Sequence, residues 1–168
     1  MQDDQLSLIQ CSMDAQLGRT EYPEGFPVLP EVPAARYYDE GFAALEHEHL
    51  WLKSWLMVGH QSEFSEPGAY RLFEKLGRSV IVSRAKDGII RAFHNTCRHR
   101  ASALLLEPQG KAMRFVCPYH AWGYSLEGNL VSVPDAHDFA CLDKAGKSLL
   151  PVRCEIWRGM IFLNFDAT

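Results

Sequence analysis

The chain contains 168 residues, of which 47% are hydrophobic and 23% are charged, and these proportions are typical of a folded globular domain. Its 17 basic and 21 acidic residues give a formal net charge of −4, which argues against general binding to nucleic acid. No apolar run is long enough to span a bilayer, and the start of the chain lacks the basic and apolar stretches of a signal peptide. The five cysteines are odd in number and have no disulfide-rich spacing, so a reducing, cytoplasmic location without membrane contact is expected.

The N-terminal part of the chain is predicted to contain an arm followed by one helix. Residues 1–34 hold four of the nine prolines, which disfavour both helix and sheet, so we expect an extended arm there. A helix is expected to begin near Asp39, a good N-cap residue, and to end between Lys53 and Trp55, because apolar residues recur at helical spacing. Residues 35–168 are then expected to form the folded domain.

From residue 55 onward the pattern is that of β-strands. Eight short runs rich in branched and aromatic residues are separated by turn signals that contain Gly, Pro, Asn or Asp. The runs are residues 55–60, 70–73, 80–83, 89–93, 114–116, 130–133, 150–154 and 160–165. The spacing predicts a mainly β fold, an antiparallel sandwich preceded by the arm and the helix, without a βαβ unit or a nucleotide-binding glycine loop.

Two loops between these runs carry residues with metal-binding chemistry. They cover about residues 95–102 and 117–124. The first contains Cys97 and His99, separated by one residue, and the second contains Cys117 and His120, separated by two. In an extended loop, side chains two residues apart point the same way, so Cys97 and His99 can face one centre. We therefore expect two thiolates and two imidazoles to converge.

Two kinds of metal centre suit this set of ligands. One is a Rieske [2Fe–2S] cluster, with both cysteines on one iron and both histidines on the other, and the second is structural zinc. Either Cys–His pair alone would be a weak signal, whereas two pairs separated by 17 residues in a β domain are a much stronger one. The residues favour the iron–sulfur cluster and leave zinc as the alternative.

The chain resembles the N-terminal Rieske domain of the alpha (large) subunit of bacterial aromatic ring-hydroxylating dioxygenases and related Rieske non-haem iron oxygenases. The similar part runs from about Tyr37 to Asp166, and its most specific segments are residues 55–60, 67–70, 95–100, 117–124 and 159–164. The resemblance implies that one Rieske-type [2Fe–2S] cluster is bound by Cys97, His99, Cys117 and His120. The family usually has glycine where this chain has Ala101 and Ala121, so alanine is expected to add strain if either position needs a positive φ.

The resemblance also implies one-electron transfer as the activity, within an oxidoreductase. In the family a ferredoxin or flavin reductase supplies electrons, which pass to a mononuclear iron in a C-terminal catalytic domain, with trimers in the full-length proteins. The Asp-x-x-His-x-x-x-x-His pattern of that iron site does not occur in this sequence, so we expect no catalytic residue and no hydroxylation by this chain alone. The substrate stays open. A free-standing Rieske ferredoxin and, in a different class, a zinc-stabilised interaction domain without a redox role are the alternatives.

The residues around the two loops predict a low reduction potential for such a cluster. High-potential Rieske proteins resemble this chain in the ligands but carry a disulfide and a serine that donates a hydrogen bond. In this chain Ser102 and Tyr119 occupy the positions of the two disulfide cysteines, so that disulfide cannot form. Trp122 occupies the position of the serine and has no hydroxyl group. Only Tyr124 retains a hydroxyl group for a cysteine sulfur, so we expect a potential near the low end of the Rieske range, on the order of −150 mV.

Overall fold

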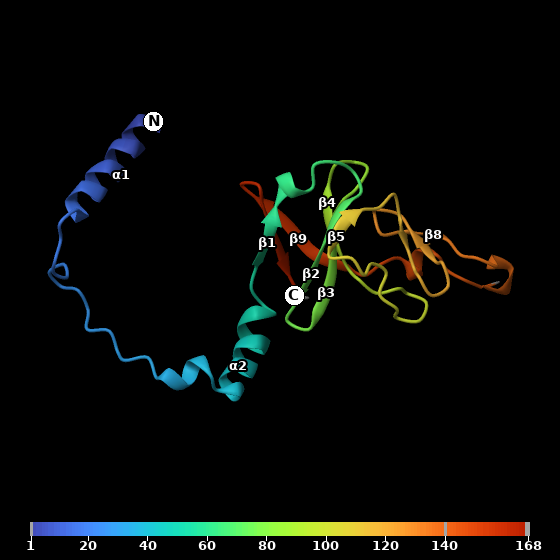
Figure 1. Cartoon of the computed structure of the whole chain (residues 1–168), viewed down its shortest axis with the longest axis horizontal. Coiled ribbons are helices and arrows are strands. Elements are labelled where there is room, and N and C mark those ends of the chain that lie inside the picture. Colours follow the sequence, from blue (N-terminus) through green and yellow to red (C-terminus); the bar gives the residue numbers. More distant parts are fainter. Residues whose placement is uncertain (1, 140, 167–168) are drawn as a thin grey trace. The chain divides into compact units, whose positions relative to one another are not determined.

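The computed structural model describes residues 2–139 and 141–166, and the chain divides into two units at Tyr38 and Asp39. The first unit contains α1 (Gln2–Gln16) and, after an irregular stretch, a 3-10 turn η1 (Ala34–Tyr37) (Figure 1). The prediction of an extended arm is therefore wrong over Gln2–Gln16. This segment has neither proline nor glycine, so nothing in it blocks helical hydrogen bonding. The prolines at 23, 27, 30 and 33 do lie in the irregular stretch, as expected.

The second unit begins with the predicted helix. The side chain of Asp39 accepts a hydrogen bond from the backbone N–H of Phe42 at 2.6 Å, which confirms Asp39 as the N-cap. The helix α2 (Glu40–Glu46) continues as a π-helical turn η2 (His47–Trp51), so it ends slightly before the predicted limit. Among the described residues, no helix is both long and apolar enough to cross a membrane.

In the described part of this unit, ten antiparallel strands follow, in two sheets. They are β1 (Leu56–His60), β2 (Ala69–Lys75), β3 (Arg78–Arg84), β4 (Ile90–His94), β5 (Gln109–Lys111), β6 (Phe115–Val116), β7 (Gly123–Tyr124), β8 (Leu130–Ser132), β9 (Pro151–Trp157) and β10 (Met160–Asn164). Short 3-10 turns occupy Gln61–Glu63, Ala136–Phe139 and Ala145–Lys147. All eight predicted runs are strands, which confirms the mainly β, antiparallel fold, whereas β5 and β7 were not predicted.

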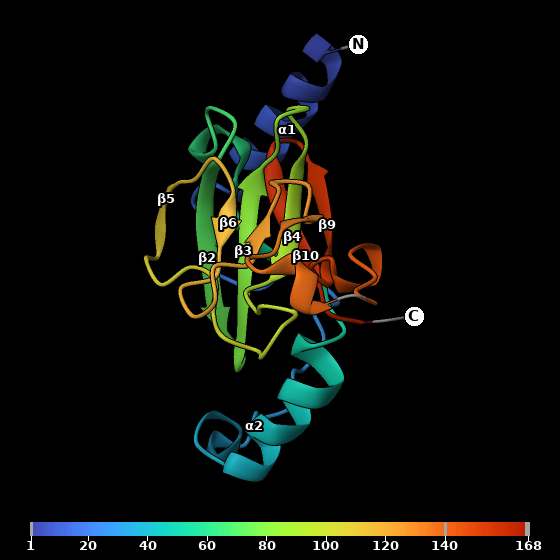
Figure 2. The same ribbon diagram turned by 90° about the vertical axis from the view of Figure 1, so that its right-hand side faces the viewer.

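The larger sheet has the strand order β1-β10-β9-β4-β3-β2-β5, and the smaller one has the order β6-β7-β8. Figure 2 shows β2, β3 and β4 side by side in the larger sheet. The strand β8 of the smaller sheet lies at the end of this unit farthest from β1 (Figure 1). The smaller sheet therefore forms a separate end of the domain, and the two loops that carry the Cys–His pairs belong to this end.

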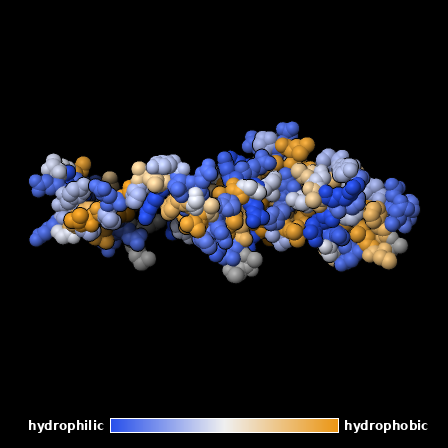
Figure 3. Space-filling model, turned by 90° about the horizontal axis from the view of Figure 1, so that it is seen from below, coloured by the Kyte–Doolittle hydropathy of each residue, from blue (hydrophilic) through white to orange (hydrophobic). Residues whose placement is uncertain are grey.

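Strand β3 is buried on both faces and separates two hydrophobic cores. Ile81 packs in one core with Phe115 and Tyr124 of the smaller sheet, and all three are fully buried. Val80 and Val82 face the other core, which is formed with β9 and β10. Hydrophilic residues predominate on the face drawn in Figure 3, with apolar residues in smaller patches between them. The core on the Ile81 side also holds both loop cysteines, so the loops are built on well-packed side chains.

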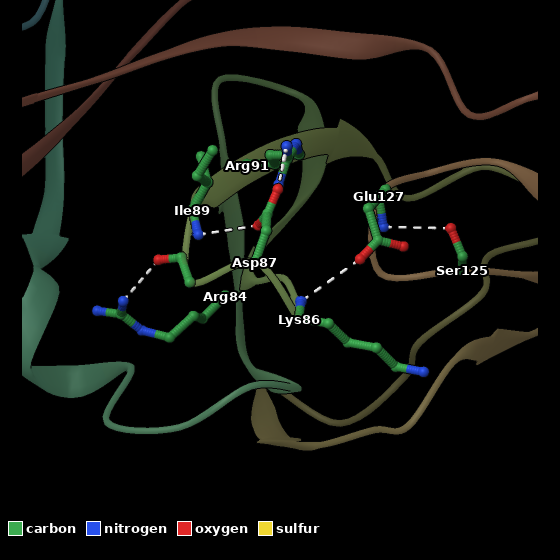
Figure 4. Close-up of polar contacts among 8 residues, drawn as sticks. Arg84, Lys86, Asp87, Ile89, Arg91, Ser125 and Glu127 are labelled. Atoms are coloured by element: carbon green, nitrogen blue, oxygen red, sulfur yellow. Dashed lines mark hydrogen bonds and ion pairs between the residues drawn. The ribbon is translucent and has the colours of Figure 1, made fainter.

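A polar network joins the β3–β4 hairpin to the smaller sheet (Figure 4). Asp87 accepts hydrogen bonds from Arg91 at 2.7 and 2.8 Å and from the backbone N–H of Ile89 at 3.0 Å. Glu127, in the loop between β7 and β8, accepts a hydrogen bond from the backbone N–H of Lys86 at 3.4 Å. The hairpin thus contacts the loop between β7 and β8 and helps to fix the smaller sheet.

Candidate metal centre

The two loops have the same backbone design. In each, the cysteine N–H donates to the carbonyl five residues later, and the cysteine carbonyl accepts from the N–H four residues later. These bonds join Cys97 to Ser102 at 2.8 Å and to Ala101 at 3.0 Å, and Cys117 to Trp122 at 2.9 Å and to Ala121 at 3.0 Å. The repeated pattern closes each loop on its own cysteine and holds the sulfur-bearing residue in a fixed backbone frame.

An alanine in the left-handed region completes each loop. The φ angle is +59° at Ala101 and +54° at Ala121. Both positions therefore need a positive φ, the condition under which alanine is expected to add strain, because the alanine Cβ crowds the backbone in this conformation and glycine has none. The hydrogen bonds that close the loops hold the two residues there.

The buried amide of Asn95 anchors the first loop to its surroundings. Its Oδ1 accepts hydrogen bonds from the backbone N–H groups of Leu104 and Leu105, both at 3.0 Å. Its Nδ2 donates to the carbonyl of Leu105 at 2.8 Å and to Ser79 Oγ at 3.1 Å. The sequence analysis missed this role. Only the polarity of a residue between a strand and Cys97 hinted at it.

Both thiols are buried, with 2% of Cys97 and 3% of Cys117 exposed. Burial alone raises the pKa of a thiol, and it keeps the pKa of Cys97 above its usual value despite hydrogen bonds from Tyr124 and the His99 N–H. For Cys117 burial is outweighed by hydrogen bonds from the N–H groups of Tyr119 and His120, so its pKa is lowered. Both sulfurs therefore receive N–H donors from their own loops, which suits thiolate ligands.

The hydroxyl group of Tyr124 bridges the first loop and the smaller sheet. It lies 3.3 Å from Cys97 Sγ and accepts a hydrogen bond from the backbone N–H of Arg98 at 2.9 Å. Because the hydroxyl oxygen accepts from that N–H, its own hydrogen is available to the sulfur. Burial and the neighbouring Cys97 sulfur raise the pKa of Tyr124 far above its usual value, so the hydroxyl keeps its proton. The expectation that Tyr124 reaches a cysteine sulfur is confirmed, but the expectation that it is the only such hydroxyl is wrong, because the Ser102 hydroxyl hydrogen bonds to the Cys117 sulfur and helps to lower the pKa of that thiol.

The two imidazoles lie edge to face, each supported by an aromatic ring. The ring centroids of His99 and His120 are 4.8 Å apart. His99 stacks on Trp122 at 4.6 Å with an interplanar angle of 6°, and His120 stacks on Tyr119 at 3.8 Å. Burial, then the positive charges of neighbouring residues, lower the pKa of His99, which favours the neutral ring that a metal requires.

One ring nitrogen has the environment of a metal ligand. Nδ1 of His99 is buried and has no hydrogen-bond partner among the described residues. A buried polar atom without a partner is costly, and coordination to a metal ion would satisfy it. In the described part of the chain, no three His, Cys, Asp or Glu side chains are grouped to hold a single metal ion. A Rieske cluster needs two pairs of ligands instead, and the thiol pair and the imidazole pair fit that requirement.

The chain matches the Rieske [2Fe–2S] domain family over residues 54–144, and it therefore belongs to this family. Members of the family carry a Rieske-type [2Fe–2S] cluster, which favours that centre over structural zinc. The site geometry and the family agree on the type of cofactor.

Among curated relatives, the alpha subunit of benzene 1,2-dioxygenase from Pseudomonas putida is 38% identical over 161 residues, covering 95% of this chain and 33% of the relative. The oxygenase subunit of carnitine monooxygenase from Escherichia coli K12 is 38% identical over 149 residues, covering 86% and 40%. A solved naphthalene 1,2-dioxygenase from Rhodococcus sp. has 34% identity and a TM-score of 0.76, covering 80% of this chain and 31% of that one. The chain thus spans about a third to two fifths of the length of these relatives.

Proposed function

We propose that Cys97, Cys117, His99 and His120 hold the Rieske-type [2Fe–2S] cluster, and that the chain transfers single electrons in an oxygenase of the ring-hydroxylating type. When bound, the cluster supplies a one-electron carrier whose two irons take thiolate and imidazole ligands, respectively. The observation that carries the ligand assignment is the pairing of two buried thiols and two contacting imidazoles on loops of the same design.

The residues of the chain prepare the site in three ways. The N–H groups of His99, Tyr119 and His120 point at the sulfurs and stabilise their negative charge. The buried indole of Trp122 covers one face of His99 and keeps water from it. The partly exposed imidazoles lie on the outer side of the site, so they are the natural route for an electron to and from a partner.

The partners follow from this role. A ferredoxin or a flavin reductase would donate electrons, and a mononuclear iron in a catalytic domain, of the same protein or of a neighbouring subunit, would accept them. The relatives are subunits of oxygenases that act on benzene and on carnitine, so both ring dioxygenation and monooxygenation are compatible with the family. A trimer of the whole protein is part of the same proposal.

The ligand assignment is tested by replacing one ligand of each kind. We expect Cys117→Ser and His120→Ala to lose iron, acid-labile sulfide and the visible and electron paramagnetic resonance signals of a Rieske cluster. Cys154→Ser and His137→Ala are the matched controls outside the loops and should keep two irons per chain. Full iron content in His120→Ala, or one zinc per native chain, would contradict the proposal.

A further inference from the structure

Each of the two loops sends one side chain across to a proposed ligand of the other loop. The residue five positions after the cysteine is Ser102 in the first loop and Trp122 in the second, and both carbonyls accept the N–H of their own cysteine, at 2.8 and 2.9 Å. The indole of Trp122 reaches His99 of the first loop, on which it stacks at 4.6 Å. The Ser102 hydroxyl reaches in the opposite direction, to the sulfur of Cys117. The same backbone position therefore serves the opposite loop in both cases.

The two cysteine sulfurs receive hydroxyl groups from opposite loops. Tyr124, at the end of the second loop, places its hydroxyl 3.3 Å from Sγ of Cys97 in the first loop. Ser102, at the end of the first loop, supplies the hydroxyl for the Cys117 sulfur in the second. Both cysteines are buried, so water does not readily replace these two donors. Each sulfur thus has one side-chain hydroxyl in addition to the N–H groups of its own loop.

The Ser102 hydroxyl has two acceptors within reach and a single hydrogen. Its Oγ also lies 3.2 Å from the carbonyl oxygen of Ala103, which is a long distance for an O–H donor. A serine hydroxyl rotates about its C–O bond to suit its surroundings. Hydrogen bonds to a charged acceptor are roughly twice as strong as those between neutral groups, so a negatively charged sulfur draws the hydrogen away from the carbonyl. The bond to Cys117 is therefore strongest when its sulfur carries the most negative charge.

We propose that Ser102 raises the reduction potential of the centre by donating its hydroxyl hydrogen to the sulfur of Cys117. This inference rests on the proposed electron-transfer function and adds a residue to it. Reduction adds one negative charge, part of which the sulfurs carry, so a donor to sulfur stabilises the reduced state more than the oxidised state. Ser102 acts through Cys117 and is thus a positioning residue, not a catalytic one.

Voltammetry of Ser102→Ala tests the proposal on the full chain. The equilibrium constant for one-electron reduction should fall about fivefold, the effect of one hydrogen bond, which is about 40 mV at about 59 mV per tenfold change. Ser102→Thr keeps a hydroxyl on the same carbon and should stay within about twofold of the native constant. Ser83→Ala is the matched control, since it removes a buried serine hydroxyl that has no hydrogen-bond partner among the described residues. It should change the constant less than about twofold.

A second comparison separates the hydrogen bond from a change of shape. Ser102→Thr and Ser102→Val differ only by a hydroxyl in place of a methyl group, so Ser102→Val alone should lose the fivefold. In resonance Raman spectra, the shift of the Fe–S stretching bands on exchange into deuterated water should be smaller in Ser102→Val than in Ser102→Thr. An unchanged constant in Ser102→Ala with an intact Rieske spectrum, or equal constants in the Thr and Val variants, would overturn the role of the hydroxyl. Absence of the Rieske spectrum from the native chain would instead contradict the proposed function.

Discussion

Replacing the two loop alanines by glycine should stabilise this protein. Ala101 and Ala121 have φ angles of +59° and +54°, a conformation that costs an alanine about 1–2 kcal/mol. Glycine avoids this cost, but it makes the unfolded chain more flexible, which lowers the free energy of unfolding by about 0.4–1 kcal/mol. The net gain is about 0.5–1 kcal/mol at each position, and the N–H groups that close the loops remain. Because the alanines are in separate loops without shared hydrogen bonds, the gains should add to about 1–2 kcal/mol.

Urea unfolding followed by circular dichroism measures this gain directly. The double variant Ala101→Gly/Ala121→Gly should move the urea midpoint upward with an unchanged slope, and should raise the thermal midpoint by about 2–8 °C. Ala103→Gly is the control in the same region, since Ala103 is not among the residues with a positive φ, and it should destabilise by about 0.4–1 kcal/mol. A double variant that is no more stable than the native chain would refute the strain argument.

Two further predictions concern single polar groups. Hydrogen bonds from Arg91 and from the Ile89 N–H lower the pKa of Asp87 to about 2, so its stabilising effect is present above the ordinary value of 3.8 and is lost as the pH falls towards 2. Asp87→Asn should therefore lose less thermal stability between pH 4 and pH 2 than the native chain, and equal losses would contradict this. Tyr124→Phe removes the hydroxyl beside Cys97 Sγ and should lower the reduction potential by about 40–60 mV in voltammetry, equivalent to one hydrogen bond, whereas an unchanged potential would mean that the hydroxyl does not donate to sulfur.

The strands that could be predicted from the sequence are those that contain a run of branched or aromatic residues. Val80, Ile81 and Val82 of β3 have the branched side chains of a buried strand, and they face both cores. By contrast, β5 and β7 are two or three residues long and contain Gly110 and Gly123, so no local pattern marks them. Gly123 is needed because a Cβ there would collide with the side chain of Ser132 on β8. Such strands exist only through pairing with a neighbour, which a local pattern does not reveal.

The helix α1 was missed for a different reason. The prolines of residues 23–33 do disfavour helix, but their effect is local, and the prediction extended it to the whole N-terminal segment. The four candidate metal ligands could be selected from the sequence, because each Cys–His pair is separated by only one or two residues within its own loop. The role of Asn95 could not be predicted, since its partners lie 9 to 16 residues away and meet it only in the folded chain.

The unequal spacings in the two loops explain the outer surface of the site. Both loops have the same backbone closure, yet the histidine is two residues after the cysteine in the first and three in the second. The residue three positions after Cys97 is therefore Arg100, and the residue two positions after Cys117 is Tyr119. The Arg100 guanidinium group lies 5.5 Å from the centre of the Tyr119 ring. Tyr119 in turn stacks on His120, while Trp122 stacks on His99 from the buried side. The two imidazoles are therefore oriented by ring contacts within the protein itself, which would reduce the reorganisation needed to bind the proposed cluster.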